Sequence, residues 1–137
     1  MFIPDEGATL ALGRAIARRL RPGDLLRLDG PLGAGKTTLV RGLLAELGWT
    51  GPVRSPTFNL LHVYPTDPPV VHADLYRVAS ADGTGLEDYA ETHVLLVEWS
   101  DRLGPIGPED GLVTLTFEGE GRRAEVRLPG GGTLNAP

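Results

Sequence analysis

The sequence predicts an α/β fold of three layers, with a mixed central sheet and a β-hairpin near the C-terminus. Residues 25–28 form a short apolar strand that leads through a glycine-rich loop into a helix with an apolar stripe. Residues 94–97 are apolar on both faces, which is typical of a buried parallel strand. Residues 112–118 and 122–128 alternate on either side of residues 119–121, which is the pattern of a hairpin.

Length and composition favour one compact unit. The chain has 137 residues, so we expect a single domain over residues 1–128 and a flexible C-terminal tail over residues 129–137. Its 19 glycines and 12 prolines indicate many tight turns. The absence of cysteine excludes disulfides, thiolate metal sites and cysteine nucleophiles.

Two helices are expected in the first third of the chain. Asp5 is a suitable N-cap for a helix through Leu20. The second helix is expected from Thr38 to Leu47, where Gly48 would end it at the C′ position. Each helix carries apolar residues at helical spacing, so each is expected to bury one face.

The middle of the chain predicts two strands and two short helical turns. Residues 59–64 and 70–76 are strand candidates, and the proline-rich linker over residues 65–69 reads as a hairpin turn. Residues 80–89 are polar and are expected to form a loop with one short helix. Residues 100–103 are expected to form a single helical turn.

The glycine-rich loop carries the clearest chemistry. Residues 30–37 match the phosphate-binding pattern G-x-x-x-x-G-K-[ST] in full, between a predicted strand and a predicted helix. Lys36, the only lysine among 13 basic residues, would reach the β- and γ-phosphates, and the Thr37 hydroxyl would ligate Mg²⁺. The fold is therefore expected to resemble that of P-loop NTPases.

Two acids complete the candidate site. Glu98 and Asp74 each end a predicted strand, and ligands of open α/β sheets bind at the carboxyl ends of strands. We assign Glu98 to Mg²⁺, and Asp74 to the orientation of the attacking water or of the metal's outer ligands, although the two roles could be exchanged. His72 could face the same side or be a structural histidine. Trp99 could pack over the nucleotide, contact a partner or belong to the core.

The class of nucleotide follows from the single lysine. The guanine-specifying segment of small GTPases contains Asn/Thr-Lys-x-Asp and needs a second lysine, so ATP is favoured over GTP. A small-molecule P-loop kinase is an alternative, although the chain leaves little length for a lid and an acceptor segment. A nucleotide-gated interaction module is another. A net charge of −5 argues against a large nucleic-acid footprint.

Five segments, taken in order, resemble the TsaE (YjeE) family of bacterial ATPases, which is needed for threonylcarbamoyladenosine (t6A) formation on tRNA. The segments are Leu-Gly-Ala-Gly-Lys-Thr-Thr at 32–38, Ser-Pro-Thr-Phe at 55–58, His-Ala-Asp-Leu-Tyr-Arg at 72–77, Gly-Leu-Glu-Asp-Tyr at 85–89 and Val-Glu-Trp at 97–99. The resemblance implies a Mg²⁺-dependent ATPase, weak alone, whose hydrolysis supports repeated turnover by the TsaB–TsaD pair. It also implies a cytoplasmic protein with no membrane segment, which meets tRNA through its partners.

The resemblance also implies roles for individual residues. Lys36, Asp74 and Glu98 would be catalytic, and Thr37 and Glu98 would hold Mg²⁺. The nucleotide-binding residues would be Glu6, Leu32, Gly33, Ala34, Gly35, Lys36, Thr37, Thr38 and Arg122, and residues 55–57 would form a switch-like loop beside the γ-phosphate. The chain departs from the family at Pro31, where an acid is usual, so this position lacks that acid's charge and a backbone N–H donor.

Overall fold

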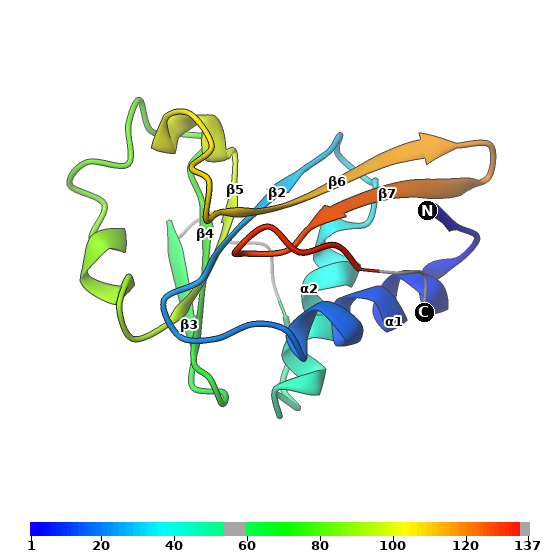
Figure 1. Ribbon diagram of the computed structural model, residues 1–137, viewed down its shortest axis with the longest axis horizontal. Helices are drawn as coiled ribbons and strands as arrows, with labels where there is room; N and C mark the ends of the chain where they lie inside the picture. The colour runs from blue at the N-terminus through cyan, green and yellow to red at the C-terminus, as the bar shows by residue number, and fades with distance from the viewer. Residues whose placement is uncertain (54–59, 135–137) are drawn as a thin grey trace.

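The computed structural model describes residues 1–53 and 60–134 and contains a seven-stranded mixed sheet (Figure 1). The strands are β1 (Phe2–Ile3), β2 (Leu25–Asp29), β3 (Leu61–Tyr64), β4 (Val70–Asp74), β5 (Val94–Glu98), β6 (Gly111–Glu118) and β7 (Gly121–Arg127). The helices are α1 (Glu6–Ala17), α2 (Lys36–Glu46) and the 3₁₀ turns η1 (Leu86–Tyr89) and η2 (Ser100–Leu103).

The strand order is β1-β7-β6-β2-β5-β4-β3. The four central strands, β6, β2, β5 and β4, are mutually parallel, whereas β7 and β3 run antiparallel to their neighbours. This arrangement confirms the mixed sheet, the buried parallel strand at β5, and the hairpins at β3–β4 and β6–β7. The two-residue strand β1 was not predicted, because its pairing with β7 joins the two ends of the chain.

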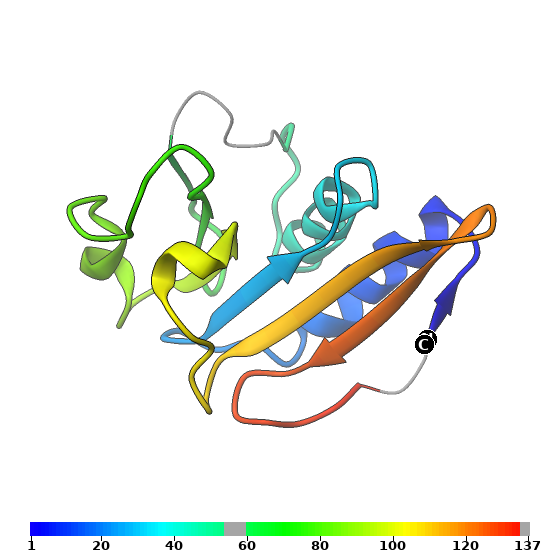
Figure 2. The same cartoon turned by 90° about the horizontal axis from the view of Figure 1, so that it is seen from above.

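Helices α1 and α2 lie side by side on one face of the sheet (Figure 2). Glycines make this contact close: a Cβ on Gly13 would lie 2.2 Å from the Leu39 carbonyl oxygen, and one on Gly42 would lie 2.3 Å from that of Leu10. The main hydrophobic core fills the space between these helices and the sheet. α2 is thereby fixed against the strands whose ends carry the candidate site.

A second core covers the opposite face of β4 and β5. Strand residues that point away from α1 and α2 pack there with Leu75 and Leu86 of the segment that follows β4; they are Val71, Ala73, Leu95 and Val97. Helices, sheet and this 3₁₀-containing segment therefore form three layers, as the sequence predicts.

Several element boundaries differ from those predicted. α1 ends at Ala17 rather than Leu20, because the amides of Arg19 and Leu20 bond three residues back, to Ile16 and Ala17, in a tighter turn. α2 begins at Lys36 rather than Thr38, directly on the phosphate loop. β4 ends at Asp74 rather than Tyr76, since the Tyr76 amide bonds the Asp74 carboxylate 2.9 Å away and turns the chain.

The chain ends show two further features. The Asp5 side chain accepts the Ala8 amide and caps α1 as predicted. Residues 129–134 turn back on β7, with the Leu128 amide 2.7 Å from the Gly132 carbonyl oxygen, and residues 135–137 lie outside the described part. The predicted division into residues 1–128 and a tail stays a prediction. Within the described residues, each helix is too short or too polar to cross a membrane.

Candidate functional site

The carboxyl ends of three neighbouring parallel strands meet at one edge of the sheet. Leu28 of β2 is in register with Glu98 of β5, and Glu98 is in register with Asp74 of β4. The loop after β2 and both predicted acids therefore converge. They border a cavity of about 580 Å³ lined by Gly30, Pro31, Leu32, Gly33, Gly35, Lys36, Thr37, Thr38, Asp74, Glu98 and Trp99.

The phosphate loop depends on glycine for its shape. Gly30, Gly33 and Gly35 have φ angles of +144°, +82° and +107°, a region that other residues rarely adopt. A Cβ on Gly30 would also lie 2.3 Å from the Leu115 carbonyl oxygen of β6. The Pro31 carbonyl accepts the Ala34 amide at 3.1 Å, so the unusual proline takes part in the turn.

Lys36 lies in the first turn of α2 with its ammonium facing the loop. Its Nζ donates to the Gly30 carbonyl oxygen at 2.7 Å and lies 3.7 Å from Glu98 Oε1. The side chain is 16% exposed. A mostly buried cation beside backbone amides at a helix N-terminus is a suitable partner for phosphate oxygens.

Glu98 is buried and has two different neighbours. Its Oε2 lies 2.7 Å from Nε2 of the fully buried His72, while Oε1 faces Lys36. Burial by itself raises the pKa of Glu98, but the hydrogen bond with His72 and the charge and hydrogen bond of Lys36 outweigh it and hold that pKa below its ordinary value. Glu98 is thus an anion at neutral pH.

Asp74 and Trp99 also line the first cavity. Asp74 Oδ1 accepts a hydrogen bond from the Tyr76 amide, and this bond does not involve Oδ2. Trp99 adopts a left-handed conformation, with φ +55°, and its ring packs against that of Tyr76, with 4.7 Å between centroids and a tilt of 47° between the ring planes. Trp99 is 47% exposed, so its interpretation as a core residue is wrong.

Glu6 and Arg122 line a second cavity, of about 280 Å³, on the other side of the phosphate loop. Arg122 donates to the Gly33 carbonyl oxygen at 3.1 Å and lies over the Phe117 ring. Glu6 pairs with Arg41 at 3.1 Å. Gly33, Gly35 and Thr38 border both this cavity and the first. Glu6 and Arg122, which the resemblance implies as nucleotide-binding residues, therefore lie beside the predicted site.

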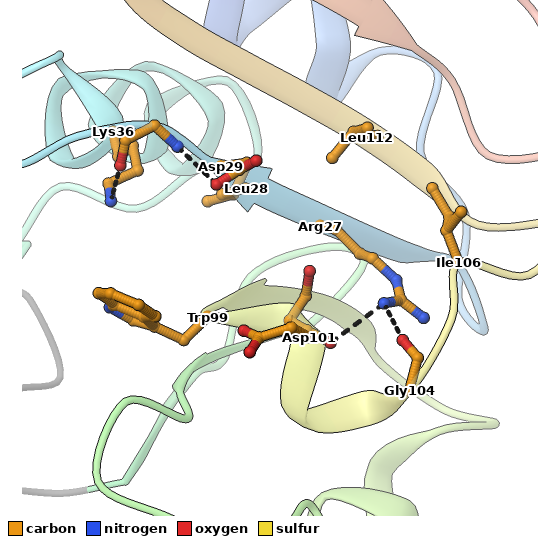
Figure 3. Close-up of a pocket in the computed structure, with 11 residues that line it drawn as sticks. Arg27, Leu28, Asp29, Lys36, Trp99, Asp101, Gly104, Ile106 and Leu112 are labelled. Atoms are coloured by element: carbon orange, nitrogen blue, oxygen red, sulfur yellow. Dashed lines mark hydrogen bonds between the residues drawn. The ribbon is translucent and has the colours of Figure 1, made fainter.

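A third cavity, of about 470 Å³, adjoins the first through Gly30, Lys36 and Trp99 (Figure 3). Arg27 of β2 lines this cavity, and its guanidinium donates to the carbonyls of Ser100 and Gly104 and to the carboxylate of Asp110. Sequence reasoning missed Arg27. The available signal was a lone cation within an otherwise apolar strand, which demands buried partners.

Three other arginines close to these segments in the sequence, Arg54, Arg77 and Arg102, differ in position. Arg102 is occupied by the Val78 carbonyl at 2.8 Å, and Arg77 is exposed on the turn after β4. Arg54 and the predicted switch-like loop at 55–57 lie outside the described residues.

The donor set fits Mg²⁺ bound together with a phosphate ligand. No cluster of three or more metal-ligating His, Cys, Asp or Glu side chains occurs within residues 1–53 and 60–134. Mg²⁺ is commonly held by one or two protein oxygens together with phosphates and water. Glu98 Oε1 at the cavity, the Thr37 hydroxyl at the start of α2 and the nearby Asp74 carboxylate supply such a partial set.

Comparisons with known proteins identify one family and one fold. Residues 3–126 match the family model described as threonylcarbamoyl adenosine biosynthesis protein TsaE. The tRNA threonylcarbamoyladenosine biosynthesis protein TsaE of Nostoc sp. is 40% identical over 92% of this chain and 83% of its own, and that of Haemophilus influenzae is 38% identical over 91% and 86%. The crystal structure of Bacillus subtilis YdiB superposes with a TM-score of 0.76, at 29% identity, over 90% of this chain and 80% of its own.

Proposed function

The chain belongs to the TsaE family of threonylcarbamoyl adenosine biosynthesis proteins, and we propose that it acts there as a Mg²⁺-dependent ATPase. Family membership assigns it to t6A biosynthesis on tRNA. The reaction, the cofactors and the partners that we give below are parts of the proposal.

One observation carries the proposal. The Lys36 ammonium lies between the Gly30 carbonyl oxygen and Glu98 Oε1, at distances of 2.7 and 3.7 Å, within the phosphate loop and beside the largest of the three cavities around it. A cation, a helix N-terminus and a carboxylate so arranged suit a nucleoside triphosphate and its metal.

Each residue then has a role. Lys36, the loop amides from Leu32 to Thr38 and the N-terminus of α2 would hold the phosphates. Thr37 and Glu98 would hold Mg²⁺, which when bound neutralises phosphate charge and polarises the transferred group. Asp74, which lines the same cavity, would orient the attacking water.

The second cavity supports placement of the rest of the nucleotide. It continues from the phosphate loop toward Glu6 and Arg122, on the side away from Glu98. A ribose or base there would meet a carboxylate acceptor and a guanidinium donor. Glu6 and Arg122 are therefore proposed as nucleotide contacts, with ATP as the nucleotide.

The proposed partners are TsaB and TsaD. With 18 acidic and 13 basic residues, the chain offers little cationic surface for tRNA, so tRNA would be held by the partners. Hydrolysis is expected to be weak for the isolated chain and faster with TsaB–TsaD. The site of action would accordingly be cytoplasmic.

A free-phosphate assay with and without TsaB–TsaD tests the proposal. Lys36→Ala and Glu98→Ala should each lower turnover by about a hundredfold or more, because each removes charge stabilisation of the transition state. Glu91→Ala, an exposed acid outside the three cavities, serves as the matched control and should leave turnover unchanged. Undiminished turnover in Glu98→Ala would overturn the metal-site assignment, and phosphate found on a small acceptor would favour a kinase.

A further inference from the structure

His72 is a buried polar side chain with a single polar contact within the described part of the chain. It is 0% exposed, and its Nδ1 has no hydrogen-bond partner among the described residues. Its Nε2 lies 2.7 Å from Glu98 Oε2. Burying an imidazole costs free energy unless its polar atoms are hydrogen-bonded. An apolar side chain would fill this position without that cost, so packing alone does not explain a histidine here.

The sheet register explains why the two side chains meet. His72 is in register with Leu96 and Glu98 with Asp74, so His72 and Glu98 are diagonal neighbours on adjacent parallel strands. Both side chains point to the same face of the sheet, toward α2. Glu98 lies two residues from Leu96, the register partner of His72, and side chains two residues apart on a strand share a face. The contact is thus set by β4 and β5 rather than by a loop.

The contact divides the two oxygens of Glu98 between different tasks. Oε2 is taken by His72 in the interior, and Oε1 is left toward Lys36 and the phosphate cavity. With the ring proton on Nε2, His72 donates to Oε2, and the buried Nδ1 is a bare lone pair that carries no unpaired N–H. Rotation of the carboxylate about its terminal torsion is then restricted.

We propose that His72 is a positioning residue, which fixes the Glu98 carboxylate so that Oε1 faces the phosphate cavity. The inference rests on the proposed function, in which Oε1 serves the metal and the phosphates. Partners that orient a metal-ligating carboxylate in this way typically change metal affinity or activity by about 10- to 100-fold.

Paired substitutions at position 72 test the inference. Gln places its N–H₂ group near the position of Nε2, Asn places it near that of Nδ1, and Leu has no donor. The measured quantity is the factor by which Mg²⁺ raises the affinity for a non-hydrolysable ATP analogue, determined by calorimetry. This factor should stay closest to wild type in His72→Gln and should fall about tenfold in His72→Asn and His72→Leu. Affinity without Mg²⁺ should not change. Melting temperatures identify any variant that fails to fold. If His72→Leu fails to fold, the comparison of His72→Gln with His72→Asn still tests the inference.

A double-mutant cycle separates positioning from packing. In a Glu98→Gln background, His72→Asn should cause no further loss of the Mg²⁺-dependent affinity, because its effect acts through the carboxylate. An equal loss in both backgrounds would overturn the inference, as would a His72→Leu variant within twofold of wild type.

A readout without nucleotide distinguishes this inference from the proposed function. In the free protein, nitrogen-15 NMR should show His72 protonated on Nε2, with a ring N–H signal that shifts when Glu98 is replaced by Gln. If the wild type binds no ATP, the proposed function fails and this signal decides the contact alone. A ring signal unchanged in Glu98→Gln would overturn the positioning role.

Discussion

The single lysine among 13 basic residues reports a geometric demand at the phosphate loop. Lys36 Nζ has a carbonyl oxygen at 2.7 Å and a carboxylate oxygen at 3.7 Å, and the side chain is mostly buried. An ammonium is a compact point charge that fits between these groups, whereas a guanidinium is a wide planar fork. The charge is therefore not the only property that this position selects.

Lys36→Arg should consequently fail although it keeps the charge. Turnover in the free-phosphate assay is expected to fall by about a hundredfold, close to the effect of removing one charge-stabilising donor. Arg18→Lys, at a side chain that is 64% exposed, is the reciprocal control and should have no effect on turnover. Full activity of Lys36→Arg would show that the loop accepts any cation.

At the scale of residues, a motif or a strand end marked the positions that the sequence could assign. Lys36, Glu98 and Asp74 were assigned in this way, and the structure brings them to one cavity, while their catalytic and metal-binding roles stay predictions. The partners of Arg27 and His72 could not be found, because each contact joins residues 26 or more positions apart and depends on strand order. Burial of a polar side chain shows its use only once the sheet register is known.

At the scale of elements, the close contact between α1 and α2 depends on two glycines that have low helix propensity. Gly13 and Gly42 are interior helix positions, where alanine is ordinarily more stable by about 1 kcal/mol. At both positions, however, a Cβ would meet a carbonyl oxygen of the other helix within 2.3 Å. Packing therefore opposes propensity at these two sites.

Gly13→Ala and Gly42→Ala should each destabilise the protein, by about 1–3 kcal/mol, because the helices must move apart. Urea unfolding measures the change. Gly7→Ala is the matched control within α1, since its Cβ would be 3.5 Å from the nearest atom, an ordinary contact, and it should be neutral or stabilising. A stabilising Gly13→Ala would refute the close packing.

The same two helices are joined by charge at one end. Glu46 of α2 lies 3.2 Å from Arg18 and 3.6 Å from Arg14 of α1. The hydrogen bond with Arg18 lowers the pKa of Glu46 below its ordinary 4.5; slight burial opposes this, and the charges of both arginines add to it. A carboxyl group whose pKa is lower in the folded than in the unfolded protein stabilises the fold at pH values above its unfolded-state pKa. This contribution is lost as the pH falls through the folded-state pKa.

Glu46→Gln should therefore lower the melting temperature slightly at pH 7, and the difference from wild type should shrink as the pH falls below about 4.5. Added salt should shrink it as well, because the pair is exposed and screened. Thermal scans across pH at two salt concentrations measure both effects. A difference that grows on acidification would have the wrong sign for this pair.

At the scale of the whole molecule, one face of the sheet packs against α1 and α2, and the opposite face of β4 and β5 packs against the segment that contains Leu75 and Leu86. The sequence predicted the sheet class, the buried strand β5 and both hairpins, because periodicity and turn residues are local signals. It did not predict strand β1 or the packing of Leu86 against β4 and β5. Both depend on which distant segments become neighbours, and single-sequence periodicity carries no such information.

Arg27 joins this sheet to the connection between β5 and β6. Its guanidinium donates to the carbonyls of Ser100, Gly104 and Pro105 and to the Asp110 carboxylate, all within 3.3 Å. The Arg27 side chain is 6% exposed. One residue of β2 thus anchors most of the chain between Trp99 and β6, including the wall of the third cavity (Figure 3).

Arg27→Met should destabilise the whole domain by about 3–5 kcal/mol, because it leaves the partly buried Asp110 carboxylate without its cation and three backbone carbonyls without the guanidinium donor. Urea unfolding followed by circular dichroism measures the loss. Arg123→Met is the matched control: that side chain is 53% exposed and its carboxylate neighbours are 3.9–4.0 Å away, so its loss should stay below about 1 kcal/mol. If both variants unfold at the same urea concentration, the 100–110 connection is held by its own turns rather than by β2.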